Sequence, residues 1–175
     1  MIRHTALVSV LLCSFTVAQS DSWSRFRGAD GKDHSPDKGL LKTWPMDGPK
    51  RLWLFEEAGA GYSGFSIKGD HLFTMGTRDD NTRLMCLDVK TGKEVWSVAV
   101  GGVLDNKWGD GPRSTPTVDG DRLYTVSGRG DILCVSSKNG KKVWSRKMRE
   151  FGGKRPYWGY SESVVVDGKQ VICTP

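Results

Sequence analysis

Short runs of alternating apolar and polar residues, separated by Gly-containing turns, follow one another along most of the chain. Alternation with a period of two is typical of half-buried strands, and no convincing amphipathic helix interrupts it. Two successive segments, residues 61–101 and 113–149, are each predicted to hold four strands. The predicted strands are residues 63–67, 71–76, 83–88, 94–98, 114–118, 122–127, 132–136 and 142–146. A further strand is predicted at residues 52–55, and a third unit is expected to begin at residue 161.

These strands belong to a repeat of about 48 residues. The segment LDVKTGKEVW, which ends at Trp96, returns as VSSKNGKKVW, which ends at Trp144. Gly92 and Gly140 occupy the turn of each copy, where glycine adopts a positive φ without a Cβ clash. A Trp that recurs at a fixed phase is expected to pack between successive units. Asp88 precedes the first turn and could brace it, whereas the second copy carries Ser in its place.

A second motif repeats beside the first. The sequences IKGD, VDGD and VDGK recur around Gly69, Gly120 and Gly168, each between two predicted strands. A period of this length with four strands in every unit predicts a β-propeller with four-stranded antiparallel blades. Propellers close with 4–8 blades, and the third copy breaks off at Pro175. We therefore expect an N-terminal fragment of about two and a half blades.

The repeat resembles that of the pyrroloquinoline-quinone-like (PQQ-like) β-propeller family. The carrying motif is a strand, a Gly-Asp turn, a second strand and then Leu-Asp-x-x-Thr-Gly-x-x-x-Trp, and the resemblance covers residues 23–175. The opening WSRFRG at residues 23–28 is similar to the start of exported, uncharacterised members. The family includes quinoprotein dehydrogenases and a non-enzymatic propeller lipoprotein of the outer-membrane assembly machinery, so the resemblance specifies the fold and leaves the activity open.

Residues 1–20 are predicted to be a secretory signal peptide. Arg3 precedes an apolar run, and small residues at Ala18 and Ser20 offer a cleavage site. The run is shorter than the ~20 residues a spanning helix needs, and Leu12 before Cys13 disfavours lipidation. We expect an exported, periplasmic or extracellular protein. Residues 21–60 are then a lead-in with one strand, residues 61–175 hold the blades, and no later segment is predicted to cross a membrane.

Charge and cysteine content add little chemistry. The formal net charge of +6 is spread through turns and strand ends, and no nucleic-acid motif is present. Cys86 and Cys134 fall at equivalent repeat positions, so they are expected to lie on corresponding strands of neighbouring blades as buried thiols. No metal-ligand spacing and no Ser-His-Asp or Cys-His arrangement occurs, so no catalytic residue, metal or cofactor is predicted.

Two long connections, residues 101–113 and 151–162, are the best candidates for a ligand site. They enter inner strands, which in propellers surround one mouth of the central channel, and they exceed the length that a turn requires. The candidate ligand-binding residues are Trp108, Asp110, Arg113, Tyr157, Trp158 and Glu162. The alternative is that the aromatic residues cover the seams between blades and that the charges pair with each other.

Three functions are compatible with these features. The first is an exported, non-enzymatic platform that binds a protein or an envelope polymer. The second is a PQQ- and calcium-dependent alcohol or sugar dehydrogenase, whose relatives often add a vicinal Cys pair and carboxylate ligands. The third is a carbohydrate-binding or hydrolytic propeller, because fold does not fix function. The platform is favoured, since every recognisable motif serves packing.

Overall fold

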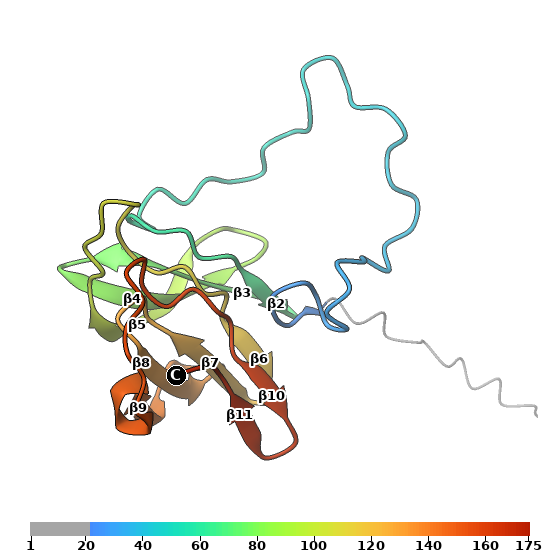
Figure 1. The fold of residues 1–175 in the computed structure, drawn as a ribbon. Coiled ribbons are helices and arrows are strands. Elements are labelled where there is room, and N and C mark those ends of the chain that lie inside the picture. Colours follow the sequence, from blue (N-terminus) through green and yellow to red (C-terminus); the bar gives the residue numbers. More distant parts are fainter. Residues whose placement is uncertain (1–21) are drawn as a thin grey trace, which may run out of the picture.

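The computed structural model describes residues 22–175 and contains two antiparallel sheets followed by a hairpin (Figure 1). The first blade consists of β2 (Ser66–Lys68), β3 (His71–Arg78), β4 (Asn81–Asp88) and β5 (Glu94–Gly102). The second blade consists of β6 (Thr117–Asp119), β7 (Arg122–Val126), β8 (Asp131–Ser136) and β9 (Lys142–Lys147). The 3₁₀ turn η1 (Met148–Phe151) leads to the hairpin β10 (Val165–Asp167)–β11 (Gln170–Ile172), which begins a third blade. The predicted all-β architecture of four-stranded antiparallel blades is confirmed.

All eight strands predicted for the first two blades are present, with shifted ends. The inner strand β2 begins at Ser66 rather than at residue 63, because the preceding backbone bonds elsewhere: the Tyr62 amide donates to the Pro112 carbonyl at 2.7 Å. The β3–β4 hairpin is longer than its counterpart β7–β8. It closes on Asp79 and Asp80, whose φ values of 50° and 56° place both in the left-handed region.

The core lies between the sheets, because each blade buries one face against the next. Phe73, Leu84 and Cys86 of the first blade form one apolar cluster with Leu123 and Val135 of the second. A second cluster joins the second blade to the third through Val126, Ile132, Met148, Tyr160 and Val164. Burial of apolar area between stacked sheets is therefore the main force that holds the blades together.

A Trp of one blade covers the Gly turn of the next. A Cβ built on Gly140 would lie 2.6 Å from the Trp96 ring, and one built on Gly92 would lie 2.5 Å from the Trp53 ring. Both glycines have φ close to 70°, so the turn requires glycine for its backbone and for the ring above it. Trp96 is half-buried and also tilts against Phe73, with ring centroids 5.9 Å apart.

Two other Trp residues, Trp144 and Trp53, have surroundings that differ from those of Trp96. Trp144 is half-buried beside Tyr124 and packs against the cluster that faces the third blade. Trp53 lies in the segment 52–55, where a strand was expected but no neighbouring strand pairs with it in the described part of the chain. A strand forms only where backbone partners lie beside it. The Trp53 indole nevertheless donates to the Val89 carbonyl at 2.8 Å and occupies over Gly92 the position that Trp96 has over Gly140.

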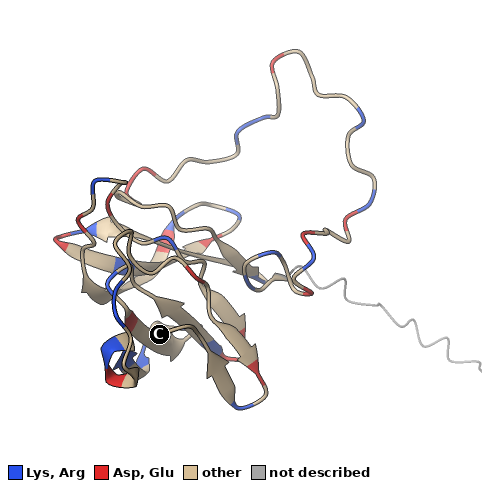
Figure 2. Cartoon of the chain, in the orientation of Figure 1, with Lys and Arg blue, Asp and Glu red and all other residues tan. Residues whose placement is uncertain are grey.

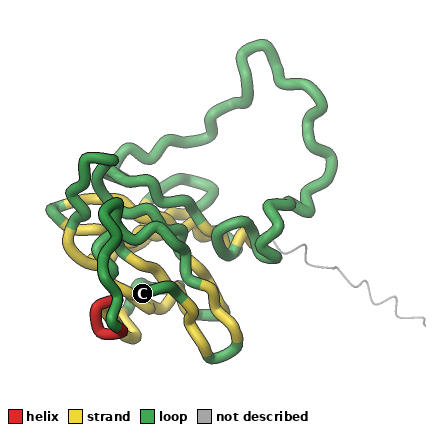
Figure 3. Tube along the Cα trace, in the orientation of Figure 1, coloured by secondary structure: helices red, strands yellow, loops and turns green. Residues whose placement is uncertain are grey.

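The N-terminal segment crosses the inner strands of all three units. β1 (Ser22–Trp23) pairs antiparallel with β2, and the Ser24 carbonyl accepts the Val118 amide of β6 at 2.7 Å. Residues 25–31 then face the start of β10 across a hollow of about 360 Å³. This pairing was not predicted, because two residues are too few for a recognisable alternation. The following residues run as a long loop that leaves the blades and returns (Figures 1 and 3).

The predicted signal peptide, residues 1–20, lies outside the residues that the structure describes. Within residues 22–175, no helix is long and apolar enough to span a bilayer.

Replacement of Gly140 tests the contact between Trp and Gly. Gly140→Ala should lower the free energy of unfolding by ~2–4 kcal/mol, because the new methyl adds a clash with Trp96 to the cost of a positive φ. Gly120→Ala is the matched control, since Gly120 has a φ of 51° and open space where its Cβ would be. It should cost only ~1 kcal/mol. Equal losses in urea unfolding would show that the indole does not constrain the turn.

The Asp88 carboxylate braces the first turn and makes stability depend on pH. It accepts the Thr91 hydroxyl and the Thr91 amide, both at 2.7 Å, and these bonds lower the pKa of Asp88 below its ordinary value of 3.8. The stabilising contribution is therefore present above that value and is lost as the pH falls through the lower folded-state pKa. Urea unfolding should show wild type to be more stable than Asp88→Asn at neutral pH, with a difference that disappears in acid. A difference that grows on acidification would contradict this assignment.

Candidate interaction face

Two long connections lie together at one end of the blades and form what we call the loop face. They are residues 103–116, between β5 and β6, and residues 152–164, between η1 and β10. The Asn106 side-chain amide donates to the Tyr157 carbonyl at 2.6 Å, which joins the two loops directly. The loop face therefore combines residues about 50 positions apart in the sequence, as expected for equivalent connections of a repeat.

Leu104 fixes both loops from beneath. Its side chain is fully buried, and the backbones of Gly128 and Gly159 pack against it so closely that a Cβ on either would clash with it. The Leu104 carbonyl accepts the Gly111 amide at 2.8 Å, which closes the first loop on itself. The Tyr160 amide donates to the Gly128 carbonyl at 3.0 Å, which ties the second loop to the β7–β8 turn. The loops are thus attached to the blades by backbone contacts.

Three aromatic residues of these loops, Trp108, Tyr157 and Trp158, are between 58% and 65% exposed. Tyr62, 64% exposed, joins the loop face because it packs against Gly109 of the first loop. The Lys107 ammonium lies 5.1 Å from the Trp108 ring centroid and 5.4 Å from that of Tyr157. The Arg113 guanidinium lies 5.6 Å from the Tyr62 ring centroid. Cations at these distances are attracted to the ring faces and hold the aromatic side chains in place.

The six residues singled out from the sequence have different roles. Trp108 and Tyr157 come together through Lys107, and Trp158 is exposed beside Tyr157 in the same loop. Arg113 donates to the Gly109 and Gly111 carbonyls, and Asp110 accepts the Asn106 amide at 2.8 Å, so both brace their own loop. Glu162 accepts the Thr174 amide and faces the third blade instead. Within residues 22–175, none of these three charged residues forms an ion pair.

Sequence reasoning missed Tyr62 and Lys107. Tyr62 belongs to a Gly-rich stretch that precedes the first inner strand, as Trp108 precedes the second and Tyr157 the third. Alignment of the three connections by their position in the repeat would have identified it. Lys107 carries no local signal, because its role depends on a ring contributed by the other loop.

Two hollows adjoin the loop face. Asp105, Asn106, Lys107, Pro156, Tyr157 and Arg155 line the first, of about 570 Å³. The second, of about 490 Å³, shares Arg155 and opens beside η1. Acidic and basic residues are interspersed over the blades, and η1 carries one of each (Figure 2). The second hollow is nevertheless positive, because Arg129, Lys147, Arg149 and Arg155 line it with Asp131.

The described residues offer little reactive chemistry. Within residues 22–175, no three His, Cys, Asp or Glu side chains come together as a potential metal site. Cys86 and Cys134 are buried free thiols, and Cys173 is a partly buried one. Burial, with smaller contributions from Asp88 and Glu94, raises the pKa of Cys86 to about 12, so it stays a thiol at neutral pH.

Comparison with known proteins agrees with this repeat architecture. A family model described as "Outer membrane protein assembly factor BamB" matches residues 99–174. A curated relative, outer membrane protein assembly factor BamB of Shewanella oneidensis, is 26% identical over 128 residues, which cover 67% of this chain. The matched residues carry a PQQ-like repeat. The resemblance inferred from the Trp and Gly-Asp motifs is thus confirmed.

The match covers 31% of the length of that curated relative. Solved structures similar to this one include the quinohemoprotein alcohol dehydrogenase of Comamonas testosteroni, with a TM-score of 0.48, 12% identity and coverage of 66% of this chain and 17% of that one. BamB of Moraxella catarrhalis has a TM-score of 0.42, 18% identity and coverage of 58% of this chain and 30% of that one.

Truncation of Leu104 tests how the loop face is held. Leu104→Ala should lower the free energy of unfolding by ~3 kcal/mol, because it leaves a cavity under both loops. Trypsin should also cut faster after Lys107 and Lys154 than in wild type. Val103→Ala is the control, since Val103 is only half-buried, and it should cost less than ~1 kcal/mol. A smaller effect at Leu104 than at Val103 would refute this arrangement.

Proposed function

We propose that this protein is an exported, non-catalytic propeller that binds a protein partner in the cell envelope through its loop face. The observation that carries the proposal is the group of exposed aromatic residues Tyr62, Trp108, Tyr157 and Trp158, accompanied by Lys107 and Arg113. Trp, Tyr and Arg are the residues that dominate the energetics of protein interfaces.

The exposure of these rings argues against a purely structural role. The alternative was that they cover the seams between blades, yet Trp108 and Tyr157 are each exposed by more than half of their surface. The seams are filled instead by the two buried clusters and the Trp96 ring. Exposed apolar groups that gather on one face favour a binding site.

The loop face also satisfies a physical requirement for tight binding, because its loops are already ordered. Asn106 joins the loops, Asp110 and Arg113 close the first one, and Leu104 fixes both to the blades. A partner would then lose little binding free energy to the ordering of the loops. This rigidity supports the description of the protein as a platform.

Export to the envelope is supported by two independent features. Residues 1–20 have the layout of a signal peptide, and the curated relative is named as an outer membrane protein assembly factor. We infer that the partner is a protein of the envelope, with an envelope polymer as the less favoured choice.

The use of a quinone cofactor is the alternative that we do not favour. A quinone held over calcium needs clustered oxygen ligands, and residues 22–175 contain no such cluster of Asp or Glu. Cys86 and Cys134 are far apart in the sequence and buried. We therefore propose that the protein uses no quinone, and we expect protein expressed from the complete gene to bind no pyrroloquinoline quinone when calcium is supplied.

Partner capture tests the proposal. Tagged protein should be cross-linked in intact cells, purified from the envelope and analysed by mass spectrometry. The double variant Trp108→Ala/Tyr157→Ala should recover at least ~30-fold less partner than wild type, because interface aromatics of this kind contribute ~2 kcal/mol or more each.

Trp44→Ala is the matched control, because Trp44 is 68% exposed but lies in the long loop away from the blades. It should leave recovery unchanged within ~2-fold. Equal recovery of the same proteins by wild type and the double variant would refute the proposal, and release by a soluble envelope polysaccharide would assign the face to a polymer.

A further inference from the structure

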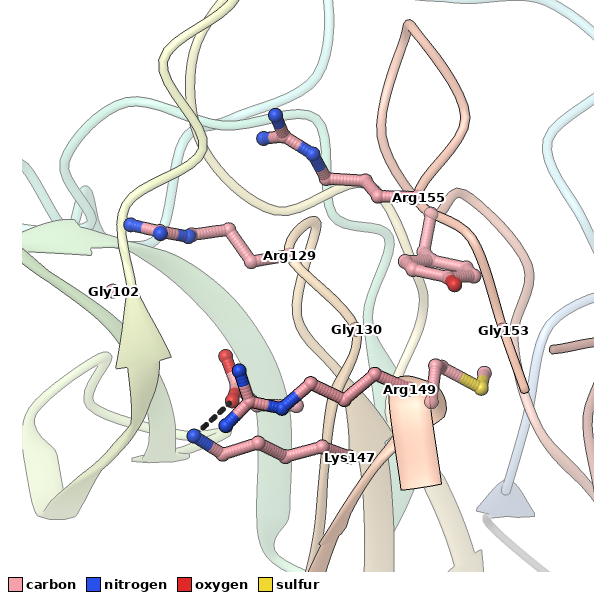
Figure 4. A pocket seen from close by; sticks show the side chains of 10 residues that line it. Gly102, Arg129, Gly130, Lys147, Arg149, Gly153 and Arg155 are labelled. Atoms are coloured by element: carbon pink, nitrogen blue, oxygen red, sulfur yellow. Dashed lines mark ion pairs between the residues drawn. The ribbon is translucent and has the colours of Figure 1, made fainter. Parts of the chain in front are cut away.

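The second hollow beside η1, here called the basic hollow, concentrates positive charge (Figure 4). Arg129 comes from the β7–β8 turn, Lys147 from the end of β9, Arg149 from η1 and Arg155 from the second loop. Asp131 is the single acidic residue among the residues that line it. Four cations therefore surround one carboxylate in a space of about 490 Å³.

Most of these cations lack partners. In the described part of the chain, the side chains of Arg129, Arg149 and Arg155 form neither a hydrogen bond nor an ion pair. Lys147 lies 3.9 Å from Asp131, whose carboxylate also accepts the Ser127 hydroxyl at 3.0 Å. Asp131 therefore cannot neutralise the three guanidinium groups, and the basic hollow keeps an uncompensated positive potential that attracts anions.

The side chain of Arg129 is exposed, and its guanidinium lies close to the end of β5. A Cβ on Gly102 would lie 3.0 Å from an Arg129 guanidinium nitrogen, and one on Gly101 would lie 2.1 Å from an Asp131 oxygen. The turn that carries Arg129 and Asp131 thus rests directly on the end of β5 in the first blade. A side chain at Gly101 would clash with Asp131, whereas at Gly102 the flexible end of Arg129 would have to shift.

Tyr160 adds a buried hydroxyl to the residues that line the basic hollow. It is 5% exposed, and its hydroxyl has no hydrogen-bond partner among the described residues. Burial, with Glu162 and Cys173 nearby, raises the pKa of Tyr160, so the group remains a neutral donor at physiological pH. A buried hydroxyl without a partner costs free energy unless a ligand or water satisfies it.

We propose that the basic hollow binds carboxylate side chains of an acidic segment in the protein partner. This inference rests on the proposed function and names the chemistry of the partner. Arg155 lines both the basic hollow and the hollow beside Tyr157, so the positive surface is continuous with the aromatic one. Arginine suits this task because its planar guanidinium meets a carboxylate with two parallel hydrogen bonds.

The arrangement of the cations favours an extended segment over one small anion. Arg129 and Arg155 reach in from one side of the basic hollow, and Arg149 and Lys147 lie on the other (Figure 4). The guanidinium groups come from separate elements and do not converge on a single point. An acidic peptide that passes between the two sides can offer each of them a carboxylate.

Binding of a labelled oligoglutamate peptide tests this inference. Fluorescence anisotropy with protein expressed from the complete gene should detect binding in low salt that weakens as ionic strength approaches ~0.15 M. The triple variant Arg129→Ala/Arg149→Ala/Arg155→Ala should bind at least ~10-fold more weakly. The control Lys38→Ala/Lys42→Ala/Lys50→Ala removes the same charge from exposed positions in the long loop and should change binding by less than ~2-fold.

The outcomes of this binding experiment distinguish an acidic peptide site from its alternatives. Equal weakening in the two triple variants would reduce the effect to net charge and overturn the inference. Binding of inorganic phosphate or heparin without binding of oligoglutamate would overturn it in favour of another anion. If the triple variant fails to fold, Arg149→Glu on exposed η1 should still weaken oligoglutamate binding by ~10-fold, and no change there would count against the inference. Loss of partner capture in Trp108→Ala/Tyr157→Ala without any oligoglutamate binding to wild type would refute this inference alone.

Discussion

Face-to-face packing of successive sheets is the interaction on which this structure depends. Each blade is too thin to bury its own apolar side chains, so Phe73 and Leu84 become buried only when Leu123 and Val135 cover them. The Trp ring over the next Gly turn closes the outer part of that seam. Trp53 over Gly92 and Trp96 over Gly140 are two copies of one contact. A propeller built this way resists local change, because each seam is shared by two blades.

The same seams explain why the connections on the loop face are ordered. Leu104 follows β5 of the first blade, yet Gly128 of the second blade and Gly159 of the second loop cover it. The loop between two blades is therefore held by its neighbours rather than by its own sequence. Exposed rings can stand on such a support without collapsing into the core. In the basic hollow, Asp131 and Arg129 lie close to the backbone of Gly101 and Gly102.

Local patterns in the sequence were sufficient for the blades and insufficient for the contacts between distant residues. Alternation and Gly turns predicted every strand from β2 to β9, since strand formation and turn geometry are encoded within a few residues. The strand expected at residues 52–55 lacks a neighbour in the described part of the chain, and β1 forms only because β2 lies beside it. The unusual length of the two connections predicted where the loop face lies, but it did not predict what each side chain does there. Arg113 and Asp110 bond within their loop, and Glu162 turns to the third blade. Tyr62 was missed because the connection that carries it was not aligned with the two later ones, and Lys107 because one of its aromatic partners lies in the other loop.

The central claim is that the loop face meets another protein, and site-specific photo-cross-linking in living cells tests it most directly. A photoreactive phenylalanine analogue at position 157 should give one dominant protein adduct, because Tyr157 is one of the exposed aromatic residues of the loop face and lines the first hollow. The same analogue at Val143, which is 42% exposed on the outer strand β9, should give none. An adduct of the same protein from Val143, or no protein adduct from position 157, would contradict the account.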